Sequence, residues 1–546
     1  MESLKKMTDK FLHVDDDKFI KEKLDKYRKC LIPFLNKKNS HANIKSWNVI
    51  IDPFLHKYIH FIGSVYQSSI ESKSSSLSKD TETKEIIIHP PISSLDFNTI
   101  IKDQDFQKQI TNIAKVFLGS NRKINVILPD TISNNQRINF RQSFLIRLSR
   151  AVIFTLVKLK ITHTVLTDAS FRSIKKSIMF SFLSMFRILV IPSYLVFLSS
   201  STRTLFKENK KFLDKASRQE INIRKDDDFD KLVEYFLPFF LPVNFLEFFE
   251  SNLKEIRSFT KIPRIGSSVG ILLSDSYKIL VALFRQSKKP IIGIQHGGNY
   301  FIYRDEPLDI IFELECSTHY FSWAKKRYTT QISPPHLGRL NRNSTISDSI
   351  VFFSNGGHLD VFHEIHKKGI ERTILENKNY FDNQAKFLME INSLTKNKMI
   401  YRPYPDKKSL SNRVAEKLRK NNIFIDKSND SFFGMQKARL LIIDYMSTTW
   451  LEAIYYDIPF IIICKNGFES RYSDKILTSI KVLKENGVLH KDFKSAIKFI
   501  TKLLLDNSID LWWNNEYLMT HITFLRRNYV RNDITTKDFI ESIKSI

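Results

Sequence analysis

A strand, a loop and a helix start follow one another between Leu440 and Ile463, with polar residues where the strand ends. The segment LLIIDYMSTTWLEAIYYDIPFIII runs from an apolar strand to Asp444, and three hydroxyl residues follow. Ser447 is a favoured N-cap type, and the amides of Thr448 and Thr449 would lie at the positive end of the helix dipole. Such a helix start can bind phosphate without a lysine.

Glu452 lies four residues after Thr448 and shares its helix face, where a carboxylate could accept hydrogen bonds from ribose hydroxyls. A capped helix without a ligand accounts for the same pattern, because Ser and Thr are common N-caps. The place of the loop, at the end of an apolar strand, favours a phosphate site. We therefore interpret the segment as a phosphate-binding site.

The second candidate is the loop of the segment GIQHGGNY, in which Gln295, Gly297, Gly298 and Asn299 surround His296. Two glycines allow the backbone to approach a ligand closely and keep His296 out of a helix. A histidine near its ordinary pKa can accept a proton from an acceptor hydroxyl or bind phosphate as a cation. The alternative is a histidine held within a tight turn.

Arg402 is the third candidate, within YRPYP at the end of a short apolar strand. Its guanidinium could bind a phosphate through two parallel hydrogen bonds, whereas the alternative is a rigid proline-rich turn. Glu313, Glu315 and His319 are weaker candidates. Because no histidine, cysteine or carboxylate spacing matches a metal site, we expect a metal-independent reaction and no cofactor.

The elements that must position these residues alternate between strands and helices. The expected strands are residues 86–88, 124–128, 164–166, 269–273, 291–294, 350–353, 399–401, 423–425, 440–443 and 460–463. Alternation of this kind predicts parallel α/β sheets with ligand sites at the strand ends. We expect an α/β domain with helical insertions at 1–340, a second α/β domain at 350–510, and a helical segment at 511–546 that packs back.

The composition is basic, with a net charge of +27 over 546 residues. A basic chain favours anionic partners, but no nucleic-acid-binding motif appears, so we expect no nucleic acid. Three widely spaced cysteines and an N-terminus without an apolar stretch lead us to expect a cytoplasmic protein.

Two segments bear on contact with a membrane. Residues 178–200 are the most apolar stretch, which we interpret as buried core. Residues 144–160 follow a helical period with Arg147, Arg150 and Lys158 expected on the exposed side. Peripheral contact of that basic side with an anionic membrane is the alternative to ordinary core packing.

The motifs GIQHGG, YRPYP and IIDYMSTTWLEAIYYDIPFIII, in this order, resemble those of GT-B-fold transferases that build bacterial surface carbohydrates. The resemblance is greatest to a surface-carbohydrate biosynthesis transferase family first described from Leptospira. CDP-glycerol glycerophosphotransferases and capsular Kdo and sialic-acid transferases share the motif order. The resemblance covers about residues 264–463. Those relatives carry a His-Pro pair where this chain has Arg402-Pro403, which leaves the donor open.

The resemblance implies a GT-B-like α/β fold of two Rossmann-like doubly wound domains facing a cleft. It implies a glycosyltransferase that moves a sugar from a nucleotide-activated donor, CMP- or CDP-linked in preference to UDP-linked, to a carbohydrate or lipid-linked acceptor. In that scheme residues 1–340 form the acceptor side with His296 as the catalytic residue, and residues 350–510 bind the donor. The donor-binding residues are Arg402, Asp444, Ser447, Thr448, Thr449 and Glu452. Polyol-phosphate transfer from a CDP donor, nucleotide-sugar epimerisation, and a non-catalytic basic protein associated with membrane or nucleic acid stay open as alternatives.

Overall fold

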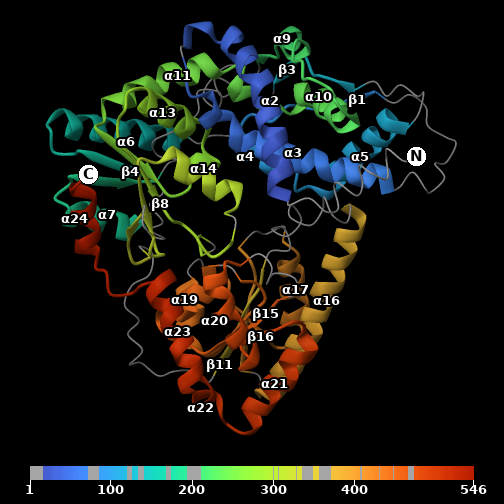
Figure 1. Cartoon of the computed structure of the whole chain (residues 1–546), viewed down its shortest axis with the longest axis vertical. Helices are drawn as coiled ribbons and strands as arrows, with labels where there is room; N and C mark the ends of the chain where they lie inside the picture. The colour runs from blue at the N-terminus through green and yellow to red at the C-terminus, as the bar shows by residue number, and fades with distance from the viewer. Residues whose placement is uncertain are drawn as a thin grey trace.

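The chain forms two lobes, each built around a six-stranded sheet (Figure 1). The structure is a computed structural model. It describes residues 16–42, 44–71, 85–119, 126–132, 140–167, 174–192, 211–298, 300–304, 306–326, 329–334, 349–355, 370–396, 398–405, 409–428, 431–446, 448–464 and 472–546.

The sheet of the first lobe has the strand order β10-β9-β8-β7-β4-β5, and its strands pair in parallel. In chain order the strands are Thr164–Thr167 (β4), Ile188–Ile191 (β5), Arg264–Ser267 (β7), Ile291–Ile294 (β8), His319–Ser322 (β9) and Thr330–Gln331 (β10). The order reverses between β4 and β7, so a crevice for ligands is expected at the carboxyl ends of the central strands.

The sheet of the second lobe has the order β13-β12-β11-β14-β15-β16, again with parallel pairs. Its strands are Ser349–Phe353 (β11), Met399–Arg402 (β12), Phe424–Ile425 (β13), Ala438–Ile443 (β14), Phe460–Ile463 (β15) and Leu489–His490 (β16). This order is the Rossmann arrangement, with its reversal between β11 and β14. The two sheets confirm the α/β class and the GT-B-like pair of doubly wound domains.

Helices cover both faces of the second sheet, which explains why its strands are almost continuously apolar. Ile350 and Phe352 of β11 pack into a core with α16, α17 and α21. Val351 and Phe353 face the opposite core, which includes α19, α20 and α23. These helices are Ile370–Leu394 (α16), Leu410–Arg419 (α17), Thr448–Tyr456 (α19), Asp474–Glu485 (α20), Phe493–Leu505 (α21) and Glu516–Tyr529 (α23).

A helical layer built from the first part of the chain covers the first sheet (Figure 1). The long helix α3 is central to it and contacts α2, α5, α10, α13 and α14. The helices are Asp16–Lys38 (α2), Trp47–Glu71 (α3), Ser94–Ile100 (α4), Gln104–Gly119 (α5), Asp228–Phe240 (α10), Phe249–Arg257 (α11), Asp275–Gln286 (α13) and Leu308–Cys316 (α14). Asp230 of α10 is tied to α2 by Lys23 at 2.6 Å.

The C-terminal helices pack on both lobes. Arg526 of α23 donates to the carbonyl of Ile454 in α19 and to Asp457, which fixes α23 on the second lobe. The last helix, α24 (Thr536–Lys544), instead lies on the first lobe, where Phe539 packs against Phe180 and Phe321. Figure 1 shows the chain crossing from one lobe to the other before α24.

The expected strands at 86–88, 124–128, 164–166, 291–294, 350–353, 399–401, 423–425, 440–443 and 460–463 are confirmed within about two residues of their ends. The strand predicted at 269–273 is wrong, because this apolar run contains the short helix α12 (Gly270–Leu273). Ser267 accepts a hydrogen bond from the Gly270 amide and so turns the chain into that helix. The strand itself comes earlier, at β7, whose polar residues hide it in the sequence.

Two expectations about surface and core need correction. The helical period places Arg150 of α6 (Phe140–Lys158) on the exposed side, but Arg150 pairs with Glu255 at 2.5 Å and lies over the ring of Phe259. The apolar stretch from residue 178 is buried only in part, because the outer face of α7 (Ile174–Leu183) is exposed. Within the ranges given above, no helix is long and apolar enough to cross a bilayer.

Asp275 offers a test of the helical layer. Its buried carboxylate accepts hydrogen bonds from Ser94, Asn244 and Lys278. The Lys278 side chain is also fully buried. We expect Asp275→Ala to lower the free energy of unfolding by about 3–5 kcal/mol, because it leaves a buried cation without its counter-ion. Urea denaturation followed by circular dichroism measures this.

The matched control is Asp228→Ala, which removes a carboxylate that pairs with Lys231 at the surface, where both side chains are more than half exposed. A surface pair of this kind contributes about 0–1 kcal/mol. Equal effects of the two substitutions would contradict the role given to Asp275.

Candidate functional site

The loop after β8 is held in shape by Gln295, whose side chain is fully buried. Its Nε2 donates to the carbonyl of Gly297 at 2.7 Å, and its Oε1 accepts from the amide of Trp323 at 2.8 Å. Gln295 therefore acts within the protein and fixes the loop. Asn299, predicted beside it, lies outside the described residues.

His296 follows Gln295 and points one ring nitrogen into the first lobe. Its Nδ1 lies 3.0 Å from the Ser268 carbonyl, 2.7 Å from the Tyr300 hydroxyl and 3.4 Å from Oε1 of Glu313. A carbonyl and a carboxylate only accept, so Nδ1 carries the proton. In the neutral ring Nε2 then holds the free electron pair, and the side chain keeps 32% of its surface exposed. This is the tautomer that a general base requires.

Glu313 of α14 is the buried carboxylate behind His296, with only 5% of its surface exposed. Its Oε2 accepts from the hydroxyls of Tyr300 at 2.7 Å and Tyr320 at 3.0 Å. Burial and the Glu313 charge raise the pKa of both phenols, so their hydroxyls stay protonated donors. Gly293 makes this packing possible, because a Cβ there would lie 2.4 Å from the Tyr320 ring and 2.3 Å from Ser317 Oγ.

Two opposing effects act on the pKa of His296. Burial disfavours the imidazolium, while the Glu313 carboxylate and the Ser268 carbonyl favour it. The attraction prevails, so the pKa of His296 is raised above its ordinary value. The imidazolium formed when His296 accepts a proton is therefore stabilised by Glu313.

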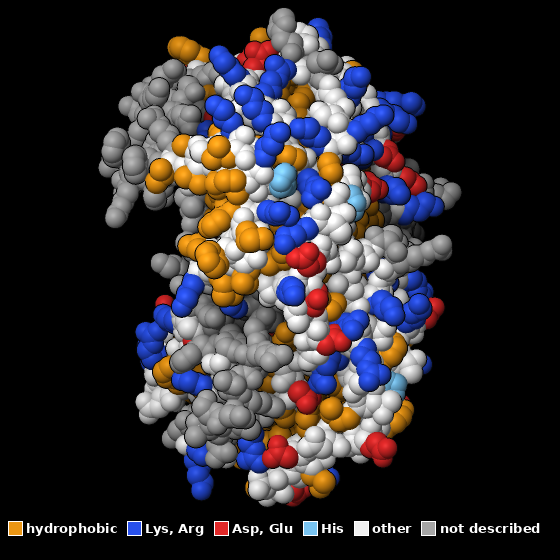
Figure 2. Space-filling view, turned by 90° about the vertical axis from the view of Figure 1, so that its left-hand side faces the viewer, with side chains coloured by type: hydrophobic (Ala, Val, Ile, Leu, Met, Phe, Trp, Pro, Cys, Tyr) orange, Lys and Arg blue, Asp and Glu red, His pale blue; other side chains and the backbone are white. Residues whose placement is uncertain are grey.

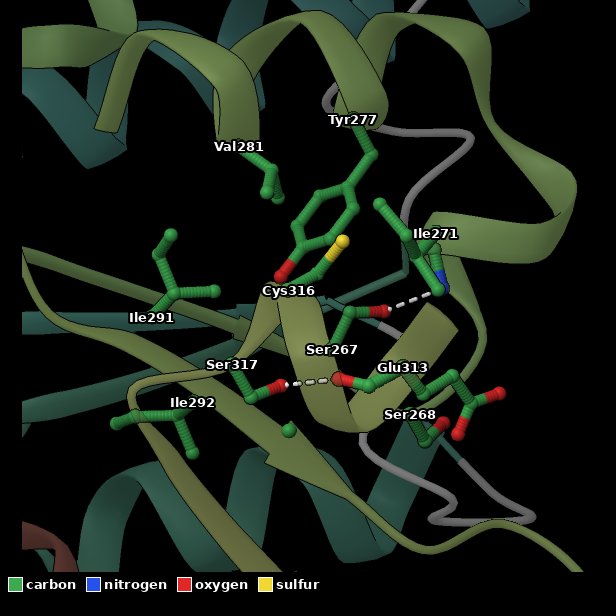
Figure 3. Close-up of a pocket in the computed structure, with 12 residues that line it drawn as sticks. Ser267, Ser268, Ile271, Tyr277, Val281, Ile291, Ile292, Glu313, Cys316 and Ser317 are labelled. Carbon is green, nitrogen blue, oxygen red and sulfur yellow. Dashed lines mark hydrogen bonds between the residues drawn. The ribbon is translucent and has the colours of Figure 1, made fainter. Parts of the chain in front are cut away.

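A small cavity lies behind this loop (Figure 3). Its wall comes from β7, β8, α12, α13 and α14. Glu313 and Ser268 are found at the same end of it, and Tyr277 and Cys316 lie further along. Burial raises the pKa of the Cys316 thiol to about 12, so the thiol is not a nucleophile near neutral pH.

The loop of the first lobe touches the start of α19 in the second lobe. The amide of Gly298 donates to Thr448 Oγ1 at 3.0 Å. A Cβ on Gly297 would meet Thr448 Oγ1 at 3.5 Å, which is ordinary contact, so the steric need for a glycine is at Gly293 instead. The two strongest sequence motifs thus meet in one place, although they are about 150 residues apart in the chain.

The remaining residues of the motif between Leu440 and Ile463 lie around that contact. Thr448 is the first residue of α19, and Thr449 is half-buried beside it. The first amides of a helix lack partners within the helix and carry the positive end of its dipole. Ser447 lies outside the described residues. Glu452 faces inward and is only 1% exposed, so its predicted contact with ribose stays a prediction.

Asp444 links three elements at the strand-order reversal of the second sheet. Its carboxylate accepts from the amide of Asn355 at 2.8 Å and from the side-chain amides of Asn355 and Gln384 at 3.1 and 2.7 Å. These contacts join the ends of β11 and β14 to α16. Asp444 thus positions the loop that leads into α19, which is consistent with a supporting place in the predicted site.

Arg402 is the last residue of β12, next to β11. Its guanidinium is hydrogen-bonded to neighbouring residues of the protein. It donates to Asp426 at 2.7 Å and to the side chain and carbonyl of Ser428 at 2.9 and 3.0 Å. It also lies over the ring of Phe353. A phosphate contact from Arg402 stays a prediction, and such a contact would use the guanidinium in an orientation set by Asp426.

A second contact between the lobes lies close in sequence to the His296 loop. Tyr303 and Tyr472 stack with ring centres 5.7 Å apart, and the amide of Ser473 donates to the carbonyl of Ile302 at 3.0 Å. Arg304 pairs with Asp474 at 3.1 Å. The segment after His296 therefore contacts the second lobe twice, first at Gly298 and again at residues 302–304.

Sequence reasoning missed the importance of Glu313 and Tyr300. Glu313 is only a weaker candidate by sequence, because its distance from His296 along the chain carries no spacing signal. Glu315 and His319 lie at the surface and do not join the site. Among the described residues, no group of three or more His, Cys, Asp or Glu side chains could hold a metal ion. The metal-independent reaction stays a prediction.

A family model described as LIC12162 family transferase matches residues 5–542. No curated protein matches the chain. Among solved structures, MurG of Acinetobacter baumannii is similar at a TM-score of 0.34 and 9% identity, over 70% of this chain and 100% of MurG. The spinosyn rhamnosyltransferase SpnG in complex with spinosyn aglycone has a TM-score of 0.35, with 10% identity over 70% of this chain and 100% of its own.

The glycosyltransferase SsfS6 of Streptomyces sp. SF2575 is also similar, with a TM-score of 0.33, 10% identity, and coverage of 70% of this chain and 99% of SsfS6. These three chains differ too much from this one to say anything about its substrate.

The Glu313–His296 pair predicts a pH effect. We expect Glu313→Gln to lower the pKa of His296, because the substitution removes the charge that favours the imidazolium while keeping an oxygen for the tyrosine hydroxyls. NMR titration of the histidine ring signals measures this, with the His296 signal assigned from its loss in His296→Gln.

The matched control is Glu315→Gln on the same helix, which makes the same charge change at an exposed position. We expect the control to leave the pKa of His296 nearly unchanged. The role given to Glu313 is wrong if Glu313→Gln leaves the pKa of His296 in place or raises it.

Proposed function

Because the chain belongs to the LIC12162 family of transferases, we propose that it moves a sugar from a nucleotide-activated donor to a surface-carbohydrate acceptor. The observation that carries the proposal is the 3.0 Å hydrogen bond between Gly298 and Thr448. This bond holds the loop of His296, whose Nε2 is free to accept a proton, against the N-terminus of α19, where we propose that phosphate binds.

In the proposed reaction the acceptor hydroxyl attacks the anomeric carbon of the donor sugar. The new C–O bond forms as the bond between that carbon and the phosphate oxygen breaks. His296 Nε2 takes the hydroxyl proton, and Glu313 stabilises the resulting imidazolium. The leaving nucleotide carries the negative charge away, so stabilising this charge is the main demand on the protein.

The start of α19 meets that demand in the proposal. The amides of Thr448 and Thr449 and the hydroxyls around them bind the leaving phosphate. Asp444 is a positioning residue that holds the loop before α19 through Asn355 and Gln384. We also propose that residues 1–340 bind the acceptor and that residues 350–510 bind the donor. The proposed location is cytoplasmic.

The donor preference rests on the resemblance of the motifs to those of CDP-glycerol and capsular transferases. We propose a CMP- or CDP-linked sugar over a UDP-linked one, with a carbohydrate or lipid-linked acceptor. Arg402 adds a cation at the end of β12, where its guanidinium is oriented by Asp426. Polyol-phosphate transfer and sugar epimerisation are distinguished from sugar transfer by their products.

Transfer should depend on His296. We expect His296→Ala to lower the rate of sugar transfer by about 10²–10⁴-fold, the usual contribution of general base catalysis. The measurement is product formation from radiolabelled CMP-, CDP- and UDP-linked donors, with circular dichroism to check folding. The control is His319→Ala, which removes an exposed histidine of the same sheet.

Full activity of His296→Ala would contradict the role of His296 as the general base. Release of labelled sugar into an acceptor supports sugar transfer. A labelled polyol phosphate in the product, or a changed sugar still linked to the nucleotide, would replace sugar transfer by the alternative chemistry.

Nucleotide binding tests the second lobe independently. We expect CMP or CDP to stabilise the chain, by about 2.7 kcal/mol at a concentration of 100 Kd, because a ligand of the native state alone shifts the unfolding equilibrium. Thr448→Val keeps the side-chain shape but removes the hydroxyl, and should weaken this stabilisation. Thermal unfolding with and without nucleotide measures both.

The control for this measurement is Thr520→Val on the exposed side of α23, where the hydroxyl bonds only within its own helix. An equal response of both variants to nucleotide would argue against phosphate binding at Thr448. A preference for UMP over CMP would overturn the donor class.

A further inference from the structure

The helix α7 exposes an apolar face, whereas serines lie on its buried side. Its inward side carries the buried serines Ser177 and Ser181, and the buried Ser184 follows directly after its end. Its outward side and the turn that follows expose six large apolar side chains: Ile178, Met179, Phe182, Leu183, Met185 and Phe186. Because a helix at a water surface normally turns its apolar face inward, this arrangement indicates that the outer face meets an apolar environment.

The inward serines are bonded and therefore hold the helix in this orientation. Ser181 Oγ accepts from the amide of Val190, and Ser184 Oγ donates to the carbonyl of Ile188. Both partners belong to β5, the edge strand of the first sheet. Phe180, on the same inward side, packs against Phe539 of α24. Rotation of α7 to bury its apolar face would break these contacts.

A second turn extends the exposed surface. Thr162 Oγ1 donates to the carbonyl of Phe186 at 2.7 Å, and the amide of His163 donates to the carbonyl of Arg187 at 3.0 Å. These bonds place the exposed Leu159 and Ile161 next to the turn after α7. We call α7 together with the two turns 159–163 and 184–187 the apolar face. Figure 2 shows hydrophobic side chains gathered on this side of the molecule, with Lys and Arg around them.

The charges around the apolar face have a single sign. Residues 140–167 and 174–192 contain eight Lys or Arg residues and no Asp or Glu. Of these, Lys158, Lys160, Lys175 and Arg187 are exposed. A second copy of this chain seated symmetrically on the face would bring its own cations against these, which opposes a dimer here. An anionic lipid surface offers both an apolar interior and the opposite charge.

We propose that the apolar face docks the protein on an anionic membrane surface. The side chains of Ile178, Phe182 and Met185, more than 60% exposed, enter the boundary between headgroups and acyl chains. Lysines and Arg187 around them bind lipid phosphates. The contact is peripheral and differs from the predicted one, in which the basic side of residues 144–160 faces the lipid, because Arg150 is turned inward to Glu255.

Cosedimentation of the full chain with vesicles tests this surface. We expect strong binding to vesicles of phosphatidylcholine mixed with phosphatidylglycerol, weak binding to phosphatidylcholine alone, and loss of binding as salt rises. Phe182→Ser should weaken binding to the anionic vesicles by about tenfold or more, because one large apolar side chain no longer leaves water. Lys158→Gln should weaken it less and reduce its salt dependence.

Two control variants show whether vesicle binding depends on the apolar face itself. Leu511→Ser removes an apolar side chain that is 81% exposed on α22 (Ile509–Trp513), and should bind vesicles like the unchanged protein. His296→Ala should also bind vesicles normally, so a failure of the proposed reaction and a failure of docking are distinguishable.

The proposal is overturned if the unchanged protein does not bind anionic vesicles, or if Phe182→Ser binds them equally well. It is also overturned if gel filtration shows a dimer that Phe182→Ser dissociates, since the face would then be covered by a second copy. Equal losses in Phe182→Ser and Leu511→Ser would show that the binding is not specific to α7.

Discussion

The carboxylate of Glu313 is the constraint around which the candidate site is arranged. A buried charge needs compensating partners: here the hydroxyls of Tyr300 and Tyr320 donate to Oε2, and the ring of His296 lies 3.4 Å from Oε1. The absence of a side chain at Gly293 gives Tyr320 its place. This buried group and the carbonyl of Ser268 together account for the tautomer and the raised pKa of His296.

The two lobes contribute different parts of one arrangement. The first supplies His296, the proposed base, at the end of β8, and the second supplies a helix start after β14, next to the reversal of its strand order. The hydrogen bond from Gly298 to Thr448 joins them, and the stacked pair Tyr303 and Tyr472 anchors the same segment a few residues later. A site of this kind exists only while the lobes are held together.

Much of the fold follows from local sequence pattern. The strands of the second sheet are apolar on both faces and end in polar residues, so both their positions and the importance of their carboxyl ends could be predicted. The strand β7 could not be predicted, because its polar residues Arg264 and Ser267 mask the strand pattern. The apolar run after it forms α12 instead. A short apolar run does not by itself distinguish a strand from a helix.

The candidate site was predictable only in the parts that lie next to each other in the chain. His296 and Thr448 belong to recognisable loops, whereas Glu313 reaches His296 through the packing of α14, which no spacing rule describes. The same limit applies to Arg402, because its partner Asp426 comes from the neighbouring strand end. The exposed apolar face of α7 was also hidden, since serines and apolar residues are interspersed there without an obvious surface side.

The most direct measurement of the central claim is a crystal structure of the chain with CMP bound. We predict phosphate oxygens within hydrogen-bond distance of the amides of Thr448 and Thr449, with Nε2 of His296 facing the same space. A nucleotide seated away from the start of α19, or a phosphate on the side of α19 remote from His296, would contradict this claim.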